Sequence, residues 1–329
     1  MSRRQALRIV LGLGAWGAFG AEAREASPLR WQRRELVGFG TTLSLEAGHA
    51  DEGTLSRALD SAVDTLQRIE AQMSLFRDDS ALSRLNRDGR LDAPPPELRE
   101  LLGLAKAVAS ASGGTFDPTV QPLWLAFAHA QREGRLPTAA EVDAARSRVD
   151  WRGLSFDAAG VRFARSGMGI TLNGIAQGYA ADRVRAVLLA HGVRHALVDA
   201  GEFAMAGRNP HGDRWALGIA DPRVEGRLLA RLFADGRCVA TSGDDQTVFS
   251  ADHRHHHIFD PRTGWSPTEM AGVTVAAPSG ALADALTKVL FVGGPARAGA
   301  LARQWGADAL WIDKRGRWDA TPGLALAPA

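Results

Sequence analysis

The sequence predicts an α+β protein that forms a single compact domain. Segments with the apolar spacing of helices and short β-rich runs follow one another without a regular βαβ rhythm, which disfavours a doubly wound sheet. No fixed-period repeat occurs, and no linker is long enough to mark a domain boundary. With 45% apolar and 23% charged residues, the 329-residue chain has the composition of a globular protein with a sizeable core.

Six segments have the apolar spacing or the boundary residues of helices. In the first of them, Leu55, Leu59 and Leu66 fall on one face of an amphipathic helix. Thr138 and Glu141 form a capping box, which marks the start of a shorter helix. The predicted helices span residues 54–73, 97–111, 138–149, 175–190, 281–292 and 296–305.

Apolar and β-branched runs predict strands before and between these helices. The first run alternates loosely around Gly38 and Thr41, and we expect one strand over residues 36–46. The other strands are expected at residues 197–198, 215–219, 228–233, 273–277 and 309–313.

Charge and cysteine content exclude several classes of protein. Lys and Arg total 39 and Asp and Glu total 37, so a net charge of +2 gives no reason to expect nucleic acid as a partner. The single cysteine, Cys238, excludes an internal disulfide framework and any multi-cysteine metal site. No apolar run reaches the roughly 18 residues of an ordinary transmembrane helix.

Residues 1–23 have the layout of an export signal. Arg3 and Arg4 precede a short apolar core, and Ala21-Glu-Ala23 offers a small-x-small cleavage site. The arginine pair indicates a twin-arginine signal. The general secretory route and an uncleaved membrane anchor are alternatives. We therefore expect residues 24–329 to form a periplasmic mature protein.

The segment from His257 to Gly264 combines a histidine with a turn. Asp260 and the proline after it begin the turn, and we expect a strand to deliver His257 to its mouth. A histidine in that place can act as a general acid or base. For Arg262 the favoured interpretation is structural, as an ion pair with Asp260 that locks the turn. The histidines at positions 255–257 cannot all converge on a metal, because neighbouring strand residues point to opposite faces.

Asp284 lies on a predicted helix with Thr287 and Lys288 three and four residues later, on the same face. An aspartate with a nearby hydroxyl offers the hard oxygen ligands that Mg²⁺ prefers. The alternative is a surface ion pair between Asp284 and Lys288. The spacing alone favours that ion pair.

Residues 171–182 form a loop that turns into a helix. Small residues at the start of a helix let backbone groups approach a phosphate-bearing ligand. Alternatively, Gly174 and Gly178 only permit close packing of helices. Phe76 and Phe116 could stack on a flat ring, although each of them taken singly is more often part of a core.

Six short motifs occur in order along the chain. They are SRLN at 83–86, GTFDPT at 114–119, GIAQGYAAD at 174–182, ATSGD at 240–244, HIFDPRTG at 257–264 and ADAL at 283–286. Together they resemble the ApbE family, the FAD:protein FMN transferases, over residues 37–313. The resemblance implies an ApbE-like fold of mixed, mostly antiparallel sheets packed with helices.

The resemblance also implies a reaction, its cofactors and its site. FMN would pass from FAD to a Thr or Ser hydroxyl of a periplasmic acceptor flavoprotein, with Mg²⁺ bound and AMP released. His257 would be catalytic, and Gly174, through its carbonyl group, and Asp284 would hold the metal. The FAD site would be lined by Phe39, Phe76, Thr115, Phe116, Asp117, Thr171, Gln177 and Ile258.

The chain departs from the family pattern at the metal motif. Lys288 stands four residues after Asp284, where the family often has a metal-binding Thr. Thr287 could supply that ligand after a slight rotation of the helix, or the Lys288 ammonium could take over part of the charge neutralisation. Other differing positions are Phe39, Thr171 and Gln177. The lipid-anchoring cysteine of some members is absent.

Two further functions are consistent with the same residues. One is a non-catalytic FAD carrier or maturation factor for a periplasmic redox complex. The other is an FAD pyrophosphatase that uses water as its acceptor.

Overall fold

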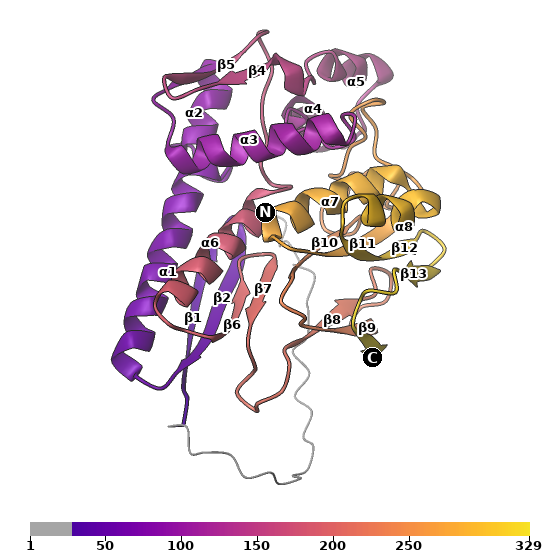
Figure 1. Ribbon diagram of the computed structural model, residues 1–329. Helices are drawn as coiled ribbons and strands as arrows, with labels where there is room; N and C mark the ends of the chain where they lie inside the picture. Colours follow the sequence, from indigo (N-terminus) through magenta and orange to yellow (C-terminus); the bar gives the residue numbers. More distant parts are fainter. Residues whose placement is uncertain (1–27) are drawn as a thin grey trace.

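The computed structural model describes residues 28–329, so the predicted export signal lies outside the described part of the chain. Its largest element is an eight-stranded sheet with the order β1-β2-β6-β7-β10-β11-β12-β13 (Figure 1). These strands are β1 (Arg30–Gly38), β2 (Thr41–His49), β6 (His195–Asp199), β7 (Phe203–Ala206), β10 (Cys238–Gly243), β11 (Met270–Ala277), β12 (Asp308–Asp313) and β13 (Trp318–Ala320). Every pairing between neighbouring strands of this sheet is antiparallel.

Two smaller antiparallel sheets flank the large one. The first has the order β14-β9-β8 and the second has the order β3-β5-β4. Their strands are β8 (Ala216–Ala220), β9 (Leu228–Phe233) and β14 (Leu326–Pro328), and β3 (Arg90–Asp92), β4 (Leu154–Phe156) and β5 (Gly160–Phe163). The helices are α1 (Glu52–Met73), α2 (Ala81–Asp88), α3 (Pro96–Ala111), α4 (Gln121–Arg132), α5 (Ala139–Arg146), α6 (Ala176–Ala190), α7 (Gly280–Gly293) and α8 (Pro295–Gln304).

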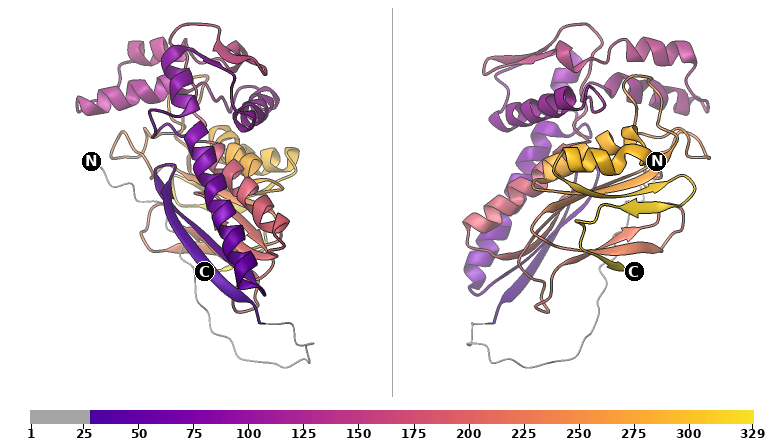
Figure 2. Two further views of the ribbon diagram at one scale, coloured as in Figure 1. Left: turned by 90° about the vertical axis from the view of Figure 1, so that its left-hand side faces the viewer. Right: turned by 45° about the vertical axis from the view of Figure 1, so that its right-hand side comes forward.

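Helix α1 follows directly from its sequence. The Asp51 side chain caps its first turn by accepting a hydrogen bond from the Thr54 backbone N–H at 2.7 Å. The leucines at helical spacing are buried, and they face β1, β2 and α6. The helix therefore runs along the β1–β2 hairpin, as the side view shows (Figure 2).

The hairpin itself corrects the prediction of one strand over residues 36–46. The structure has two strands there, β1 and β2, joined at Phe39 and Gly40. Both residues have positive φ angles, 50° and 76°, which reverse the chain. The alternating pattern continues on both sides of this short turn, so the pattern alone does not reveal it.

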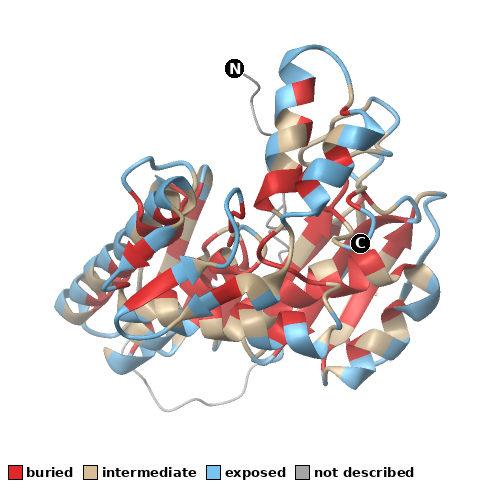
Figure 3. Ribbon diagram, turned by 90° about the horizontal axis from the view of Figure 1, so that it is seen from above, coloured by how far each residue is buried: buried red, intermediate tan, exposed pale blue. Residues whose placement is uncertain are grey.

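The core lies between the large sheet and the helices α1, α6, α7 and α8, which cover one face of it (Figure 1). On the other face, Leu217 and Leu232 of the β8–β9 pair pack against Leu197 and Leu310 of the large sheet. Viewed from above, the sheet interior and the inward faces of these helices are buried, and the outer faces are exposed (Figure 3). Both faces of the sheet are thus covered where β8 and β9 pack on it, whereas β1 exposes Arg33, Glu35 and Val37.

A third apolar cluster joins α4 and α5 to the loop that carries the histidine segment. Phe127 of α4 lies with its ring centroid 5.0 Å from that of Phe259 and 5.2 Å from that of Phe249. Val142 of α5 completes this buried cluster. This cluster fixes the loop between residues 249 and 265 against helices α4 and α5.

The six predicted helices are present, with ends shifted by three residues or fewer. Helix α5 starts at the predicted capping box, in which Thr138 and Glu141 exchange hydrogen bonds. Helices α2 and α4 were not predicted. The strand expected to deliver His257 is absent: residues 255–257 lie in a loop, with one isolated bridge between Val248 and His256. Among residues 28–329, no helix has both the length and the apolar character needed to cross a membrane.

Candidate active site

A cavity of about 1000 Å³ opens where helices α2 and α4 meet the end of the large sheet. Its size is typical of sites for large organic ligands. It brings together His257, Gly174 and Lys288 from three distant segments. The residues predicted for the FAD site also line it without exception: Phe39, Phe76, Thr115, Phe116, Asp117, Thr171, Gln177 and Ile258.

Aromatic side chains form part of the cavity wall. Phe39 sits in the β1–β2 turn and is buried, whereas the side chain of Phe76 is 45% exposed. The turn lies close to the Phe76 ring, because a Cβ atom added to Gly40 would come within 2.8 Å of that ring. Phe116 adds a third, buried ring. These rings can enclose a flat aromatic ligand.

Asp117 stabilises the loop in this part of the cavity wall. Its carboxylate accepts hydrogen bonds from the Thr119 backbone N–H at 2.8 Å, the Thr119 hydroxyl at 2.6 Å and the Trp151 backbone N–H at 3.1 Å. Burial raises the pKa of this carboxyl above its ordinary value. Asp117 therefore braces the loop around it, and its bonds hold two wall segments together.

Asn86, the last residue of the SRLN motif, does the same for another part of the wall. Its side-chain amide donates to the Ile170 carbonyl at 2.8 Å and accepts from the Ile170 N–H at 2.7 Å. This pair of bonds imitates one step of a β ladder and ties α2 to the loop before Thr171. Asn86 of the SRLN motif thus positions Thr171, a cavity-lining residue that is far from it in the sequence.

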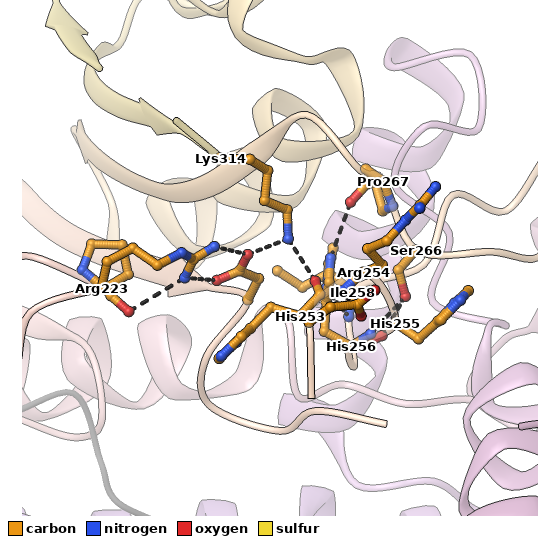
Figure 4. A network of polar contacts seen from close by, with 12 residues as sticks. Arg223, His253, Arg254, His255, His256, Ile258, Ser266, Pro267 and Lys314 are labelled. Carbon is orange, nitrogen blue, oxygen red and sulfur yellow. Dashed lines mark hydrogen bonds and ion pairs between the residues drawn. The ribbon is translucent and has the colours of Figure 1, made fainter. Parts of the chain in front are cut away.

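The buried neighbour of His257 fixes the histidine segment. The His256 side chain bonds to the Pro267 carbonyl through Nε2 at 3.1 Å and accepts from the Ile258 N–H through Nδ1 at 3.3 Å (Figure 4). Its backbone N–H donates to the Ser266 hydroxyl, which donates to its carbonyl. Burial lowers the pKa of His256 to about 4, so the ring is neutral at pH 7.

A buried carboxylate, Asp244, anchors the start of the same segment. Arg223 donates to it at 2.7 Å, and Lys314 binds it as well. Lys314 also donates to the His253 carbonyl at 2.6 Å, as the close-up shows (Figure 4). His253 itself has a positive φ of 58°. The histidine segment is therefore held from both ends before it reaches the cavity.

The far side of the segment contains the predicted turn. Arg262 donates to Asp260 at 2.9 Å and 2.7 Å in a bidentate pair, which supports the structural interpretation of Arg262. The three consecutive histidine rings have different surroundings, although those of His256 and His257 meet edge to face with centroids 6.4 Å apart. His255 lies against Trp265, His256 against Phe291, and His257 lines the cavity.

The two side chains of the predicted metal site, Asp284 and Thr287, lie deeper than the cavity wall. Asp284 is 0% exposed, and its Oδ1 atom accepts from the Lys288 ammonium at 2.5 Å. Its Oδ2 atom accepts from the Gly178 N–H at 3.3 Å. The ion pair expected from the spacing is present, but it is buried at Asp284 and does not belong to the surface.

Thr287 is also buried, and its hydroxyl already has two partners. It donates to the Asp284 backbone carbonyl at 2.7 Å and bonds to the Ser242 hydroxyl at 2.8 Å. Neither Thr287 nor Asp284 lines the cavity, whereas Lys288 does. Of the predicted metal ligands, only Gly174 reaches the cavity, and its metal role stays a prediction.

The resident side chains do not fit a Mg²⁺ ion as they stand. Magnesium requires near-octahedral oxygen ligands at short distance. Both oxygens of Asp284 and the hydroxyl of Thr287 are engaged by protein partners, and the nearest cation is the ammonium of Lys288. Within residues 28–329, no three His, Cys, Asp or Glu side chains are grouped as ligands of a metal.

Glu202 is a cavity residue that the sequence analysis missed. It is 5% exposed, and its side chain accepts from the Thr241 N–H at 2.9 Å. Burial, followed by the nearby Asp284 carboxylate, raises its pKa well above the ordinary value. The available signal was that Glu202 and Asp199 interrupt an otherwise apolar run at 196–206, because acidic residues are seldom buried without a role.

Fold and site together define an enzyme whose cavity accommodates a large, partly aromatic ligand beside a histidine and a lysine. The comparisons with known proteins agree. The chain matches the ApbE family over residues 39–311. It is 34% identical to an FAD:protein FMN transferase of Treponema pallidum, covering 94% of this chain and 90% of that protein. This chain belongs to the ApbE family.

Solved structures show the same architecture. The ApbE protein of Thermotoga maritima superposes with a TM-score of 0.80 at 26% identity, covering 89% of this chain and 97% of that one. The flavinyl transferase ApbE of Pseudomonas stutzeri gives 0.77 at 30% identity, covering 89% and 94%. The predicted family, its fold and the assignment as an enzyme are confirmed, and the roles of single residues stay predictions.

Proposed function

We propose that this protein transfers the FMN moiety of FAD to a Thr or Ser hydroxyl of a periplasmic acceptor protein and releases AMP. One observation supports this most strongly. The eight residues predicted to line an FAD site, together with His257, surround a single cavity in a chain of this family. The cavity is large enough for a dinucleotide and has aromatic walls for the flavin ring.

The reaction breaks the phosphoanhydride bond of the pyrophosphate and forms a phosphoester bond to the acceptor. The acceptor hydroxyl oxygen forms a bond to the phosphorus on the FMN side of the pyrophosphate, and its proton passes to His257. The bond between that phosphorus and the bridging oxygen breaks, and AMP leaves with this oxygen. The acceptor then carries FMN through a phosphodiester.

The chain's own groups supply the setting for this step. The anchored histidine segment holds His257 at the cavity, and Lys288 brings a positive charge to it. Phosphoryl-type transfer depends on positioning and on neutralising the developing charge. The Mg²⁺ implied by the resemblance has no part in this step, because the partners of Asp284 and Thr287 oppose its binding.

The proposed location follows from residues 1–23, whose layout indicates export to the periplasm by a twin-arginine-like signal. An acceptor in that compartment must present an accessible Thr or Ser hydroxyl. Fractionating cells that express the full chain tests the location. Recovery of the protein from the cytoplasmic fraction alone would contradict it.

The test of activity uses the full chain, FAD and a periplasmic acceptor that a known transferase can flavinylate. We expect a covalent, fluorescent flavin on the acceptor in a denaturing gel, and an equal amount of AMP by chromatography. If FAD binds but no AMP appears, the protein is a carrier. If FMN and AMP appear equally without acceptor, it is a pyrophosphatase.

Replacing the histidine tests the mechanism. We expect His257→Ala to bind FAD normally and to lose about 10²- to 10⁴-fold in transfer rate, the usual contribution of a general base. His129→Ala is the matched control, because His129 is exposed on α4. Equal rates for the two variants would contradict a base role for His257.

A further inference from the structure

The position of Lys288 is the starting point. Its ammonium lies 2.5 Å from Oδ1 of the fully buried Asp284, and its side chain is 19% exposed. Its stem passes close to Gly174, because a Cβ atom added to Gly174 would lie 3.1 Å from the Lys288 Cε atom. The lysine therefore lies between Gly174 and Asp284, the two residues predicted to share a metal ion.

This arrangement leaves a divalent ion poorly accommodated. A Mg²⁺ ion on Asp284 would have to displace the ammonium from a buried carboxylate, or else lie beside it. Mg²⁺ and the Lys288 ammonium, side by side in a poorly hydrated site, would repel each other strongly. The Thr287 hydroxyl is held by two protein partners, because it donates to the Asp284 backbone carbonyl and bonds to the Ser242 hydroxyl.

The ammonium can itself do part of what a metal would do. It carries three N–H donors, and the bond to Asp284 uses one of them. Lys288 lines the cavity, so the remaining donors are available to anionic oxygens of a ligand there. Lysine is a common phosphate-binding side chain that acts as a point charge.

We propose that Lys288 replaces the metal ion in this chain: its ammonium occupies the cation position on Asp284, excludes Mg²⁺ from it and binds the pyrophosphate oxygens of FAD. This inference rests on the proposed FAD chemistry only for its last part. The exclusion of Mg²⁺ is a property of the free protein, and it is testable without FAD or acceptor.

The deciding experiment titrates MgCl₂ into the free, full-length protein in a calorimeter and follows the melting temperature in EDTA and in Mg²⁺. We expect the unaltered chain to show no saturable binding and no Mg²⁺-dependent shift. In Lys288→Thr the carboxylate loses its cation, so we expect a lower melting temperature in EDTA and recovery in Mg²⁺, as linkage requires. Lys106→Met is the control, because Lys106 bonds to the Leu154 carbonyl away from Asp284.

A second measurement uses FAD. The unaltered chain should bind FAD with dissociation constants that agree within about twofold in EDTA and in Mg²⁺, whereas Lys288→Met should bind it about tenfold more weakly or worse, because a charge-assisted contact is lost. Saturable Mg²⁺ binding by the unaltered chain, or FAD binding that requires Mg²⁺, would overturn the proposal, even if Lys288→Thr does not fold. Absence of FAD binding in every condition would instead refute the proposed function, while the MgCl₂ titration still decides whether Lys288 excludes the metal.

Discussion

Asp117 and Asp284 are buried carboxylates near one cavity, and the protein stabilises them in different ways. Asp117 accepts three hydrogen bonds from neighbouring loops, so it acts as a brace. Asp284 has an ammonium on one oxygen and a backbone N–H on the other. A buried carboxylate needs partners, because burying it unpaired is too unfavourable in free energy. The kind of donor that it binds, a loop N–H or an ammonium, therefore decides the role of each aspartate.

His256 gives a prediction about pH and stability. Its pKa is lowered to about 4 in the folded protein, against about 6.5 when exposed. Between these pH values the unfolded chain binds more protons at this site, so the stability that it contributes is complete above pH 6.5 and is lost as the pH falls toward 4. We expect His256 to remove about 2 kcal/mol from the free energy of unfolding between pH 7 and pH 5.

Urea unfolding at several pH values measures this effect. The pH dependence should weaken in His256→Gln, which cannot take up the proton, and should persist in His129→Gln. The same pH slope in His256→Gln and the unaltered chain would contradict the prediction. A general loss of stability in the variant does not affect this comparison, because the test compares slopes.

At the scale of elements, α6 and α7 depend on each other. The Asp182 carboxylate of α6 accepts from the N–H groups of Gly280 at 2.7 Å and Ala281 at 3.0 Å, and so caps the first turn of α7. The helices approach so closely that a Cβ atom on Gly178 would lie 2.0 Å from the Gly280 carbonyl oxygen. The packing interpretation of Gly178 is thereby supported, and this contact places the Asp284 carboxylate against the Gly178 backbone N–H.

Two glycine substitutions test this contact. We expect Gly178→Ala to reduce the free energy of unfolding by about 1–3 kcal/mol or more, because the overlap is with backbone atoms and cannot relax by rotation of a side chain. Gly103→Ala, in the interior of α3 with no atom within 4 Å of the added Cβ, should increase it by about 0.5–1 kcal/mol. Chemical denaturation measures both, and similar effects of the two changes would contradict the close approach.

The elements also show how far the sequence predicts the fold. Long amphipathic segments such as α1 were predicted within a few residues, because their apolar spacing is a local property. The β1–β2 turn, α2 and α4 were not predicted. Whether these sequences form a turn or a helix depends on the segments that pack against them.

At the scale of the whole molecule, the cavity depends on ties between distant segments. Asp244 follows β10, Arg223 follows β8, and Lys314 follows β12, so three separate connections meet at one buried carboxylate. From there Lys314 reaches the His253 carbonyl and holds the histidine segment. The position of His257 is therefore set by connections that follow β10 and β12 of the large sheet and β8 of a small sheet.

This arrangement predicts an effect at a distance. Lys314→Met should destabilise the protein by about 1–3 kcal/mol, because Asp244 stays buried with one fewer donor. Faster amide hydrogen exchange should appear across residues 250–258, with a lower transfer rate and unchanged FAD affinity. Arg315→Met is the control, since the Arg315 side chain is exposed. Unchanged exchange in the segment would show that Lys314 does not hold it.

The sequence by itself determined the family, the long helices and the residues of the predicted FAD site that line the cavity. The helices follow from the local periodicity of apolar residues. The family and the cavity residues follow from short motifs in the sequence, which do not depend on how distant segments pack. Only the tertiary structure decided that Asp117 is a brace, that Glu202 is buried beside the site and that Lys288 lies on a buried Asp284. The physical reason is that burial and the choice of a charge partner depend on segments far apart in the chain, so they exist only after α6, α7 and the large sheet have packed together.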